Sequence, residues 1–270
     1  MKESQLVELI DGALEAADNA SQKVLEIYHS EDFKFDNKQD GSPVTEADIA
    51  SHQILNSALI KLSNKIPILS EEGNANSKQD ESLFWLIDPL DGTKEFINRN
   101  GEFTVNIALI EQGAPILGIV FSPAIEENFY GAMNMGAYKV KGKERTNILP
   151  KKQKEDECHI TLSKSHKSKD DEWFIDKCKK RFGVVQEIPT GSSLKLCKVA
   201  EGKADIYSRL GPTYQWDIAA GQAVVESSGG VVSDLAGNPL SYKFDPELRN
   251  PHFYCAGDKE FPWLELFQDN

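Results

Sequence analysis

The chain has little of what marks secreted, thiolate-binding or membrane proteins. It has only 4 cysteines, widely spaced and with no Cys-x-x-Cys pair, so a zinc-thiolate site or a dithiol redox motif is not expected. No apolar run approaches the roughly 18–20 residues that a membrane-spanning helix needs. The first residues, Met1 to Ser4, lack the apolar core of a signal peptide. We therefore expect a cytoplasmic protein with reduced cysteines and no integral membrane segment. Peripheral association with the inner face of the membrane is left open.

Positive charge is also scarce. Lys and Arg number 30 against 43 Asp and Glu, for a net charge of −13. Without a basic stripe to neutralise a phosphate backbone, a nucleic-acid polymer is excluded as partner. A small phosphorylated ligand is not excluded, because bound cations can reverse the local field. The 40% hydrophobic and 27% charged content is typical of a soluble globular protein, with length enough for one large domain or two lobes.

Most elements can be placed from periodicity and turn residues. Residues 4–29 have the apolar spacing of one long helix, and 102–110, 115–121, 127–132 and 136–140 are expected to form antiparallel strands. Residues 147–157, rich in Lys and Glu, are the best boundary between lobes by composition. A helix is predicted from Trp216 to Glu226, with Asp217 at its start, where aspartate is a good N-cap.

The stretch from Leu83 to Phe96 carries the strongest chemical signal. The apolar run 83–87 predicts a buried strand, which ends in Asp88-Pro89-Leu90-Asp91-Gly92 because Pro89 cannot donate a ladder hydrogen bond. Gly92 permits a tight turn, and a short helix can begin at Thr93. Two carboxylates and the free N–H groups of a helix start therefore meet at one corner. Carboxylates suit hard divalent cations, and helix N-termini suit phosphate.

Several interpretations of this corner compete. The Asp-x-Asp-Gly-Thr motif of aspartyl-phosphate phosphatases needs one residue between the aspartates, whereas this chain has two, Pro89 and Leu90. The added residue would turn the second aspartate to the other face of the strand, so this motif is rejected. An EF-hand loop counted from Asp88 fails, because Leu90 stands where a ligand is needed and Thr93 where glycine is needed. An ordinary turn with two solvated aspartates is the plain alternative, although so many fixed positions rarely coincide by chance.

Residues 88–93 match the Asp-Pro-x-Asp-Gly-Thr signature at every fixed position, and the chain resembles the inositol monophosphatase superfamily of lithium-sensitive, magnesium-dependent phosphatases. Its second signature, Trp-Asp followed by small residues and later Gly-Gly, is matched by Trp216-Asp217 and Gly229-Gly230. The resemblance covers nearly the whole chain. It implies an α/β fold of the layered α+β type, an alternating αβαβα sandwich. Residues 1–150 would form a metal-binding lobe and 151–270 a substrate lobe.

Within the superfamily, four stretches resemble the CysQ-type 3'(2'),5'-bisphosphate nucleotidases. They are Lys94-Glu95-Phe96, where inositol monophosphatases usually have Thr-Asn-Phe, together with residues 100–110, 191–195 and 216–221. The resemblance implies hydrolysis of 3'-phosphoadenosine 5'-phosphate to AMP and phosphate, by a monomer or a homodimer. One alternative is an inositol- or sugar-phosphate phosphatase on the same metal site. A catalytically idle metal- or nucleotide-binding regulator is another.

The resemblance also assigns the metal site and its catalytic neighbours. It implies two or three Mg²⁺ ions, and an all-oxygen ligand set suits Mg²⁺ better than a soft metal. The assigned metal ligands are Glu71, Asp88, the Leu90 carbonyl, Asp91 and Asp217. Catalysis is assigned to Glu71 and to Asp48 with Thr93, the last two activating water. From the residues alone, Asp48 completes a capping box with Thr45, and Glu71 stands in a polar turn.

Two further stretches are candidates for holding an anion. Gly191-Ser192-Ser193 precedes a helix with Lys195 in its first turn, and the strand 159–162 runs into Ser163-Lys164-Ser165-His166. The second stretch is equally consistent with an ordinary polar loop. The predicted substrate contacts are Asp91, Gly92, Thr93, Lys94, Ser163, His166, Gly191, Ser192, Ser193, Lys195 and Asp217.

Overall fold

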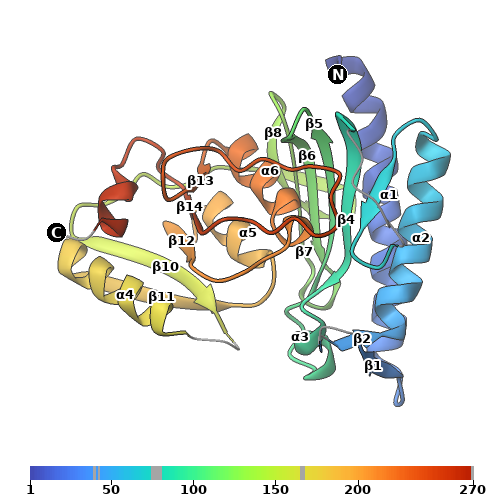
Figure 1. The fold of residues 1–270 in the computed structure, drawn as a ribbon, viewed down its shortest axis with the longest axis horizontal. Helices are drawn as coiled ribbons and strands as arrows, with labels where there is room; N and C mark the ends of the chain where they lie inside the picture. Colours follow the sequence, from blue (N-terminus) through green and yellow to red (C-terminus); the bar gives the residue numbers. More distant parts are fainter. Residues whose placement is uncertain (39–40, 42, 74–80, 165–167, 269–270) are drawn as a thin grey trace.

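The computed structural model describes residues 1–38, 41, 43–73, 81–164 and 168–268. Helices and sheets alternate along its long axis (Figure 1). A pair of helices covers a seven-stranded sheet, two further helices fill the space between that sheet and a five-stranded sheet, and one helix covers the outside. The predicted αβαβα sandwich is therefore confirmed.

The first layer consists of α1 (Glu3–Tyr28) and α2 (Glu46–Leu62), which pack against each other and on one face of the large sheet. The helix predicted over 4–29 is α1. A two-stranded arm, β1 (Phe35–Asn37) and β2 (Pro43–Thr45), leads directly into α2. No helix in the described ranges is both long enough and apolar enough to span a membrane.

The large sheet has the strand order β3 to β9, with β3 parallel to β4 and every other pair antiparallel. On β4, Trp85 and Ile87 face α1 and α2, whereas Phe84 and Leu86 face the third layer. Burial on both faces explains the unbroken apolar run. The strands are β3 (Ile68–Ser70), β4 (Leu83–Asp91), β5 (Thr104–Glu111), β6 (Ala114–Ser122), β7 (Glu127–Ala132), β8 (Gly136–Lys141) and β9 (Glu144–Ile148).

The third layer contains α5 (Leu194–Ala200) and α6 (Ala219–Ser228). The backbone of α6 lies so close to the sheet that a Cβ on Gly118 would stand 2.1 Å from the Ala220 carbonyl oxygen. Glycine on the strand therefore sets the spacing between these layers. Two short helices, α3 (Thr93–Ile97) and η1 (Pro123–Ile125), connect strands of the large sheet.

The second sheet has the strand order β11-β10-β12-β14-β13. Its central strand β12 (Ile206–Arg209) runs parallel to β10 and antiparallel to β14. Helix α4 (Lys169–Phe182) and η3 (Trp263–Phe267) form the outer layer. The other strands are β10 (Glu157–Ser163), β11 (Val184–Thr190), β13 (Val231–Asp234) and β14 (Phe253–Ala256).

One local prediction is wrong. The helix predicted from Trp216 begins only at Ala219, because η2 (Gln215–Asp217) is a separate 3-10 turn and Ile218 leaves helical geometry at φ −120°. The lobe boundary at residues 147–157 stays a prediction, and its first two residues belong to β9, which extends to Ile148. Most of β9 is exposed and polar, so it lacks the apolar alternation by which a strand is detected.

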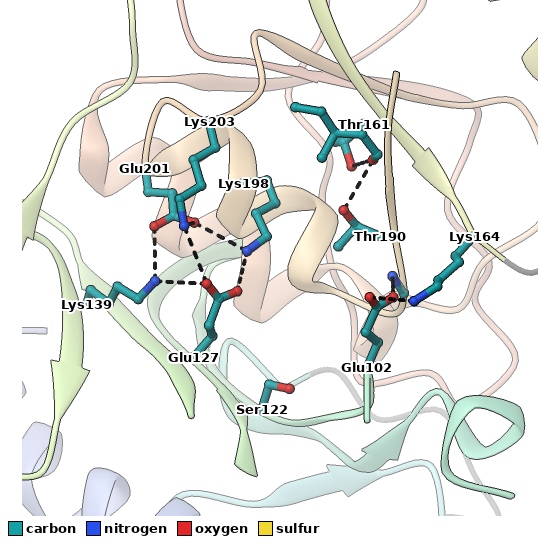
Figure 2. A network of polar contacts seen from close by, with 12 residues as sticks. Glu102, Ser122, Glu127, Lys139, Thr161, Lys164, Thr190, Lys198, Glu201 and Lys203 are labelled. Carbon is teal, nitrogen blue, oxygen red and sulfur yellow. Dashed lines mark hydrogen bonds and ion pairs between the residues drawn. The ribbon is translucent and has the colours of Figure 1, made fainter. Parts of the chain in front are cut away.

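An ionic cluster joins the large sheet to the end of α5 (Figure 2). Glu127 of β7 and Glu201 at the end of α5 each pair with Lys139, Lys198 and Lys203. Burial alone would raise the pKa of Glu127, but the bonds from Lys198 and Lys139 outweigh burial and lower this pKa to about 2. The cluster fixes the end of α5 that lies away from the residues described next.

Candidate active site

A β-bulge orients the two aspartates of β4. Asp88 lies opposite Asn106 and Asp91 opposite Thr104, so β4 has one more residue than β5 between these pairs. In a regular strand, residues three apart point to opposite faces. The extra residue of the bulge cancels this reversal, and both carboxylates face the third layer. The Pro89-Leu90 spacer thus gives Asp88 and Asp91 a common face.

The turn after the bulge is held by short local bonds. The Leu90 N–H donates to Asp88 Oδ1 at 3.0 Å, which fixes that carboxylate. Gly92 adopts φ +87°, a left-handed conformation that favours glycine. Helix α3 then begins at Thr93, whose hydroxyl lies 3.3 Å from the Leu90 carbonyl oxygen. The predicted strand, turn and short helix are therefore present.

Asp48 caps a helix and also contacts Thr93. Its Oδ2 accepts the Thr45 N–H at 2.7 Å and the Thr45 hydroxyl at 2.6 Å, which is the capping box at the start of α2. Its Oδ1 accepts the Thr93 hydroxyl at 3.2 Å. Burial raises the pKa of Asp48, although the bonds from Thr45 oppose the rise. The two oxygens thus allow both contacts at once.

Glu71 reaches the site from the edge of the sheet. The parallel pairing of Ser70 with Ile87 continues as a bond from the Glu71 N–H to the Ile87 carbonyl oxygen at 3.2 Å. Glu71 therefore lies beside Asp88, and its charge is one cause of the raised pKa of Asp88. The Lys38 ammonium lies 2.6 Å from Glu71 Oε1 and also pairs with Glu72. The Lys38 ammonium thus neutralises part of the negative charge of Glu71 and Glu72.

Asp217 approaches from the second half of the chain. Its Oδ2 accepts the Tyr214 N–H at 2.9 Å, so it caps η2 and not α6, contrary to the sequence prediction. The rings of Tyr214 and Trp216 stack with centroids 4.8 Å apart on either side of the turn. Asp217 lies near enough to Asp91 for the charge of Asp91 to act on it.

The acidic side chains raise one another's pKa values. Burial raises the pKa of Asp88 well above its usual range, and Glu71, Asp91 and Asp217 add to the rise. Burial likewise raises the pKa of Asp91 to about 6, with the positive charge of Lys195 opposing it. Burial and the charges of Asp91 and Glu71 raise the pKa of Asp217. A bound cation would relieve both the desolvation and the repulsion.

The donor set fits a hard cation. Carboxylates and a backbone carbonyl supply only oxygen, which suits Mg²⁺ and not a soft metal. In the described part of the chain, no three His, Cys, Asp or Glu side chains already surround one point as ligands of a single ion. Glu71 is turned toward Lys38, and Asp91 accepts the Ser193 N–H at 2.6 Å. Binding a cation therefore requires these side chains to exchange partners.

A cavity of about 170 Å³ lies against Asp91 and Asp217. It brings together residues from both halves of the chain, and its volume suits a small polar group. Of the predicted substrate contacts, it is lined by Asp91, Gly92, Ser163, Ser192, Ser193, Lys195 and Asp217. The sequence analysis missed four of its polar residues, which are Glu95, Tyr207, Arg209 and Thr213.

Two cations face this cavity. Lys195 is buried and donates to the Ser192 carbonyl oxygen at 2.6 Å, with its ammonium 5.5 Å from the centre of the Tyr207 ring. Burial lowers its pKa, while Asp91 opposes the decrease. Arg209, at the end of β12, has a buried Nε with no hydrogen-bond partner among the described residues. An anion in the cavity would meet both groups.

The remaining predicted contacts are not among the described residues that line the cavity. Lys94 is exposed on α3 and is not among the described residues that line the cavity. His166 lies outside the described residues. The N–H groups of Gly191 and Ser193 already donate to Glu102 and Asp91. An anion at this helix start would therefore be bound by the Lys195 ammonium and not by these two N–H groups.

The chain is similar to known proteins over most of its length. The chain is 41% identical over 250 residues to the 3'(2'),5'-bisphosphate nucleotidase CysQ of Salmonella typhimurium, covering 91% of this chain and 98% of that protein. The CysQ of Escherichia coli K12 is 40% identical over 248 residues, with the same coverage. The crystal structure of CysQ from Bacteroides thetaiotaomicron superposes with a TM-score of 0.80 at 37% identity, over 94% of this chain and 97% of that one. Because the family model of the inositol monophosphatases also matches residues 5–257, the chain belongs to the inositol monophosphatase family.

Proposed function

We propose that the chain is a magnesium-dependent phosphatase that removes the 3'-phosphate of 3'-phosphoadenosine 5'-phosphate to give AMP and phosphate. The observation that carries the proposal is the cavity in which Asp91 and Asp217 face Lys195 and Arg209. Acidic ligands on one side suit the metal ions of a phosphatase, and cations on the other suit a second phosphate. The CysQ relatives, which are named as bisphosphate nucleotidases, support the same substrate class.

The metal site would use the side chains that raise one another's pKa values. Glu71, Asp88, Asp91 and Asp217, with the Leu90 carbonyl, would hold two or three Mg²⁺ ions. When bound, these ions polarise the phosphoryl oxygens and stabilise the charge that develops on the leaving oxygen. Asp88 is 1% exposed, and the N–H of Leu90 orients its carboxylate. The bulge of β4 keeps Asp88 and Asp91 on one face for this purpose.

Asp48 and Thr93 would activate the attacking water. The Thr93 hydroxyl donates to Asp48 Oδ1, so the lone pairs of Thr93 Oγ1 remain available to accept a hydrogen bond from water. A proton leaving that water can pass to Thr93 Oγ1 as the Thr93 proton passes to Asp48. The raised pKa of Asp48 suits it to accept that proton. Its bonds to Thr45 keep it in place.

A substrate panel tests this function. Phosphate release would be measured from 3'-phosphoadenosine 5'-phosphate, inositol 1-phosphate and fructose 1,6-bisphosphate, each with and without Mg²⁺. We expect the highest kcat/KM for the bisphosphorylated nucleotide, and only with Mg²⁺, because its second phosphate can meet Lys195 and Arg209. If inositol 1-phosphate is the better substrate, the nucleotide assignment is wrong.

Lys195→Ala is expected to lower kcat/KM for 3'-phosphoadenosine 5'-phosphate by about 10–100-fold. A charge-assisted contact with phosphate contributes roughly 1.5–3 kcal/mol, which corresponds to this range. The monophosphate 3'-AMP lacks the second phosphate and should be affected much less. The measurement is steady-state phosphate release from both substrates. Lys179→Ala, a change of the same type at an exposed position of α4, is the control. An equal loss for both substrates would mean that Lys195 supports the site and does not select the nucleotide.

A further inference from the structure

Glu102, just before β5, connects two segments of the second half of the chain (Figure 2). Its Oε2 accepts the Gly191 N–H at 2.8 Å, and its Oε1 lies 3.0 Å from the Lys164 ammonium. Gly191 precedes α5 and Lys164 follows β10, so one carboxylate holds both segments. Residue 102 is not among the described residues that line the cavity.

The turn that Glu102 holds is strained. Ser192 adopts φ +45°, in the left-handed region that non-glycine residues rarely enter. Such a conformation persists only where the surroundings fix it. First-lobe carboxylates fix both sides of this turn, Glu102 at the Gly191 N–H and Asp91 at the Ser193 N–H. When Asp91 turns its oxygens toward a metal ion, Glu102 is the carboxylate that remains on the turn.

The position of this turn determines where the Lys195 ammonium lies. The Ser192 carbonyl oxygen accepts the Lys195 Nζ–H at 2.6 Å, so a shift of the turn moves the ammonium with it. The contact with Glu102 also leaves no room for a larger residue at 191, since a Cβ there would stand 2.7 Å from the Glu102 carbonyl oxygen. Backbone and side chain of Glu102 therefore act on the same turn.

The second contact orients the other wall of the cavity. Ser163, which lines the cavity, directly precedes Lys164. The Lys164 side chain is 45% exposed, and an exposed ion pair contributes little to stability. Its pairing with Glu102 therefore matters chiefly for geometry, because it draws the end of β10 toward the start of α5.

We propose that Glu102 is a positioning residue for the phosphate remote from the reacting one. It acts through the Gly191–Lys195 turn and through Lys164, and it is not among the described residues that line the cavity. The inference rests on the proposed function, because it takes the Lys195 cavity to receive that second phosphate. Loss of Glu102 should then weaken binding of the bisphosphate more than it slows the chemical step.

The test compares kcat and KM for 3'-phosphoadenosine 5'-phosphate and 3'-AMP in wild type, Glu102→Ala, Glu102→Gln and Lys164→Ala. For Glu102→Ala we expect KM for the bisphosphate to rise by about 10-fold, with kcat within about 3-fold and 3'-AMP little changed. Glutamine can still accept the Gly191 N–H, so Glu102→Gln should recover most of the loss. Glutamine cannot form the ion pair with Lys164, so the rise in KM that remains in Glu102→Gln should equal the rise in Lys164→Ala. Glu8→Ala on the exposed face of α1 is the control.

The outcomes separate this inference from the proposed function. If wild type does not prefer the bisphosphate to 3'-AMP, the proposed function fails first. If wild type prefers it and Glu102→Ala keeps that preference, the positioning role is wrong. Equal losses for both substrates without recovery by glutamine would also overturn it, because they indicate general damage to the site. The glutamine and Lys164 variants keep the test valid if the alanine variant folds poorly.

Discussion

Asp91→Asn is expected to lower kcat/KM by about 10³-fold without unfolding the protein. Asparagine keeps the size of the side chain and an oxygen that can accept the Ser193 N–H, now 2.6 Å from Asp91 Oδ2. It removes one negative charge from the proposed metal site. Loss of charge stabilisation at the leaving group costs several kcal/mol of activation free energy, which corresponds to a rate loss of this size.

The experiment needs a comparison of fold as well as rate. Steady-state phosphate release would be measured at saturating Mg²⁺, together with thermal unfolding. Asp176→Asn makes the same chemical change at an exposed position of α4 and should leave kcat/KM unchanged. A folded Asp91→Asn protein within a few-fold of wild-type activity would show that Asp91 is not a metal ligand.

The corner at residues 83–96 was predictable because its signals are local. An apolar run, a proline, a glycine and two aspartates lie in one short stretch, and each restricts the backbone in a known way. The capping box at Thr45 and Asp48 is local in the same sense. The common face of Asp88 and Asp91 was not derivable from strand periodicity, since it depends on a bulge against β5. Only the family resemblance supplied it.

The residues that the sequence did not reveal act through tertiary contacts. Lys38 reaches Glu71 from the two-stranded arm, and Arg209 enters the cavity from the end of β12. Neither lies in a motif. Glu71 is 33 residues from Lys38, and the cavity that Arg209 lines is built from segments distant in the chain. The start of α6 was misplaced for a related reason. Aspartate is a good N-cap, but Asp217 caps the η2 turn that precedes the helix.

The pKa shifts of the site could not be predicted without the three-dimensional structure. Sequence alone shows four acidic residues in three separate segments, whereas their burial together raises the pKa of Asp88, Asp91 and Asp217. A buried acidic cluster of this kind makes the folded state bind protons that the unfolded chain releases. Without a cation, its contribution to stability is therefore lost as the pH rises from about 4, the unfolded pKa of aspartate, through the folded value of about 6 for Asp91.

Chelation of divalent cations is accordingly expected to abolish activity, and Mg²⁺ to raise the melting temperature. An ion that binds only the folded state stabilises it by about 2.7 kcal/mol at 100 times its Kd, or roughly 5–10 °C for a chain of this size. The shift should be larger at pH 7.5 than at pH 5.5, because Asp91, a proposed metal ligand, would have to lose its proton to bind the ion.

Phosphate release and thermal unfolding would be followed in excess chelator and after Mg²⁺ is restored. Asp91→Asn is the matched comparison for unfolding, and its Mg²⁺-induced shift should be much smaller than that of wild type. Recovery of activity with Mg²⁺ would separate loss of the ion from irreversible unfolding. Full activity in excess chelator would contradict the metal-dependent mechanism. The Mg²⁺-induced rise in melting temperature could instead be the same at both pH values and in Asp91→Asn. The ion would then bind away from Asp91, since only an ion among these carboxylates competes with their protons.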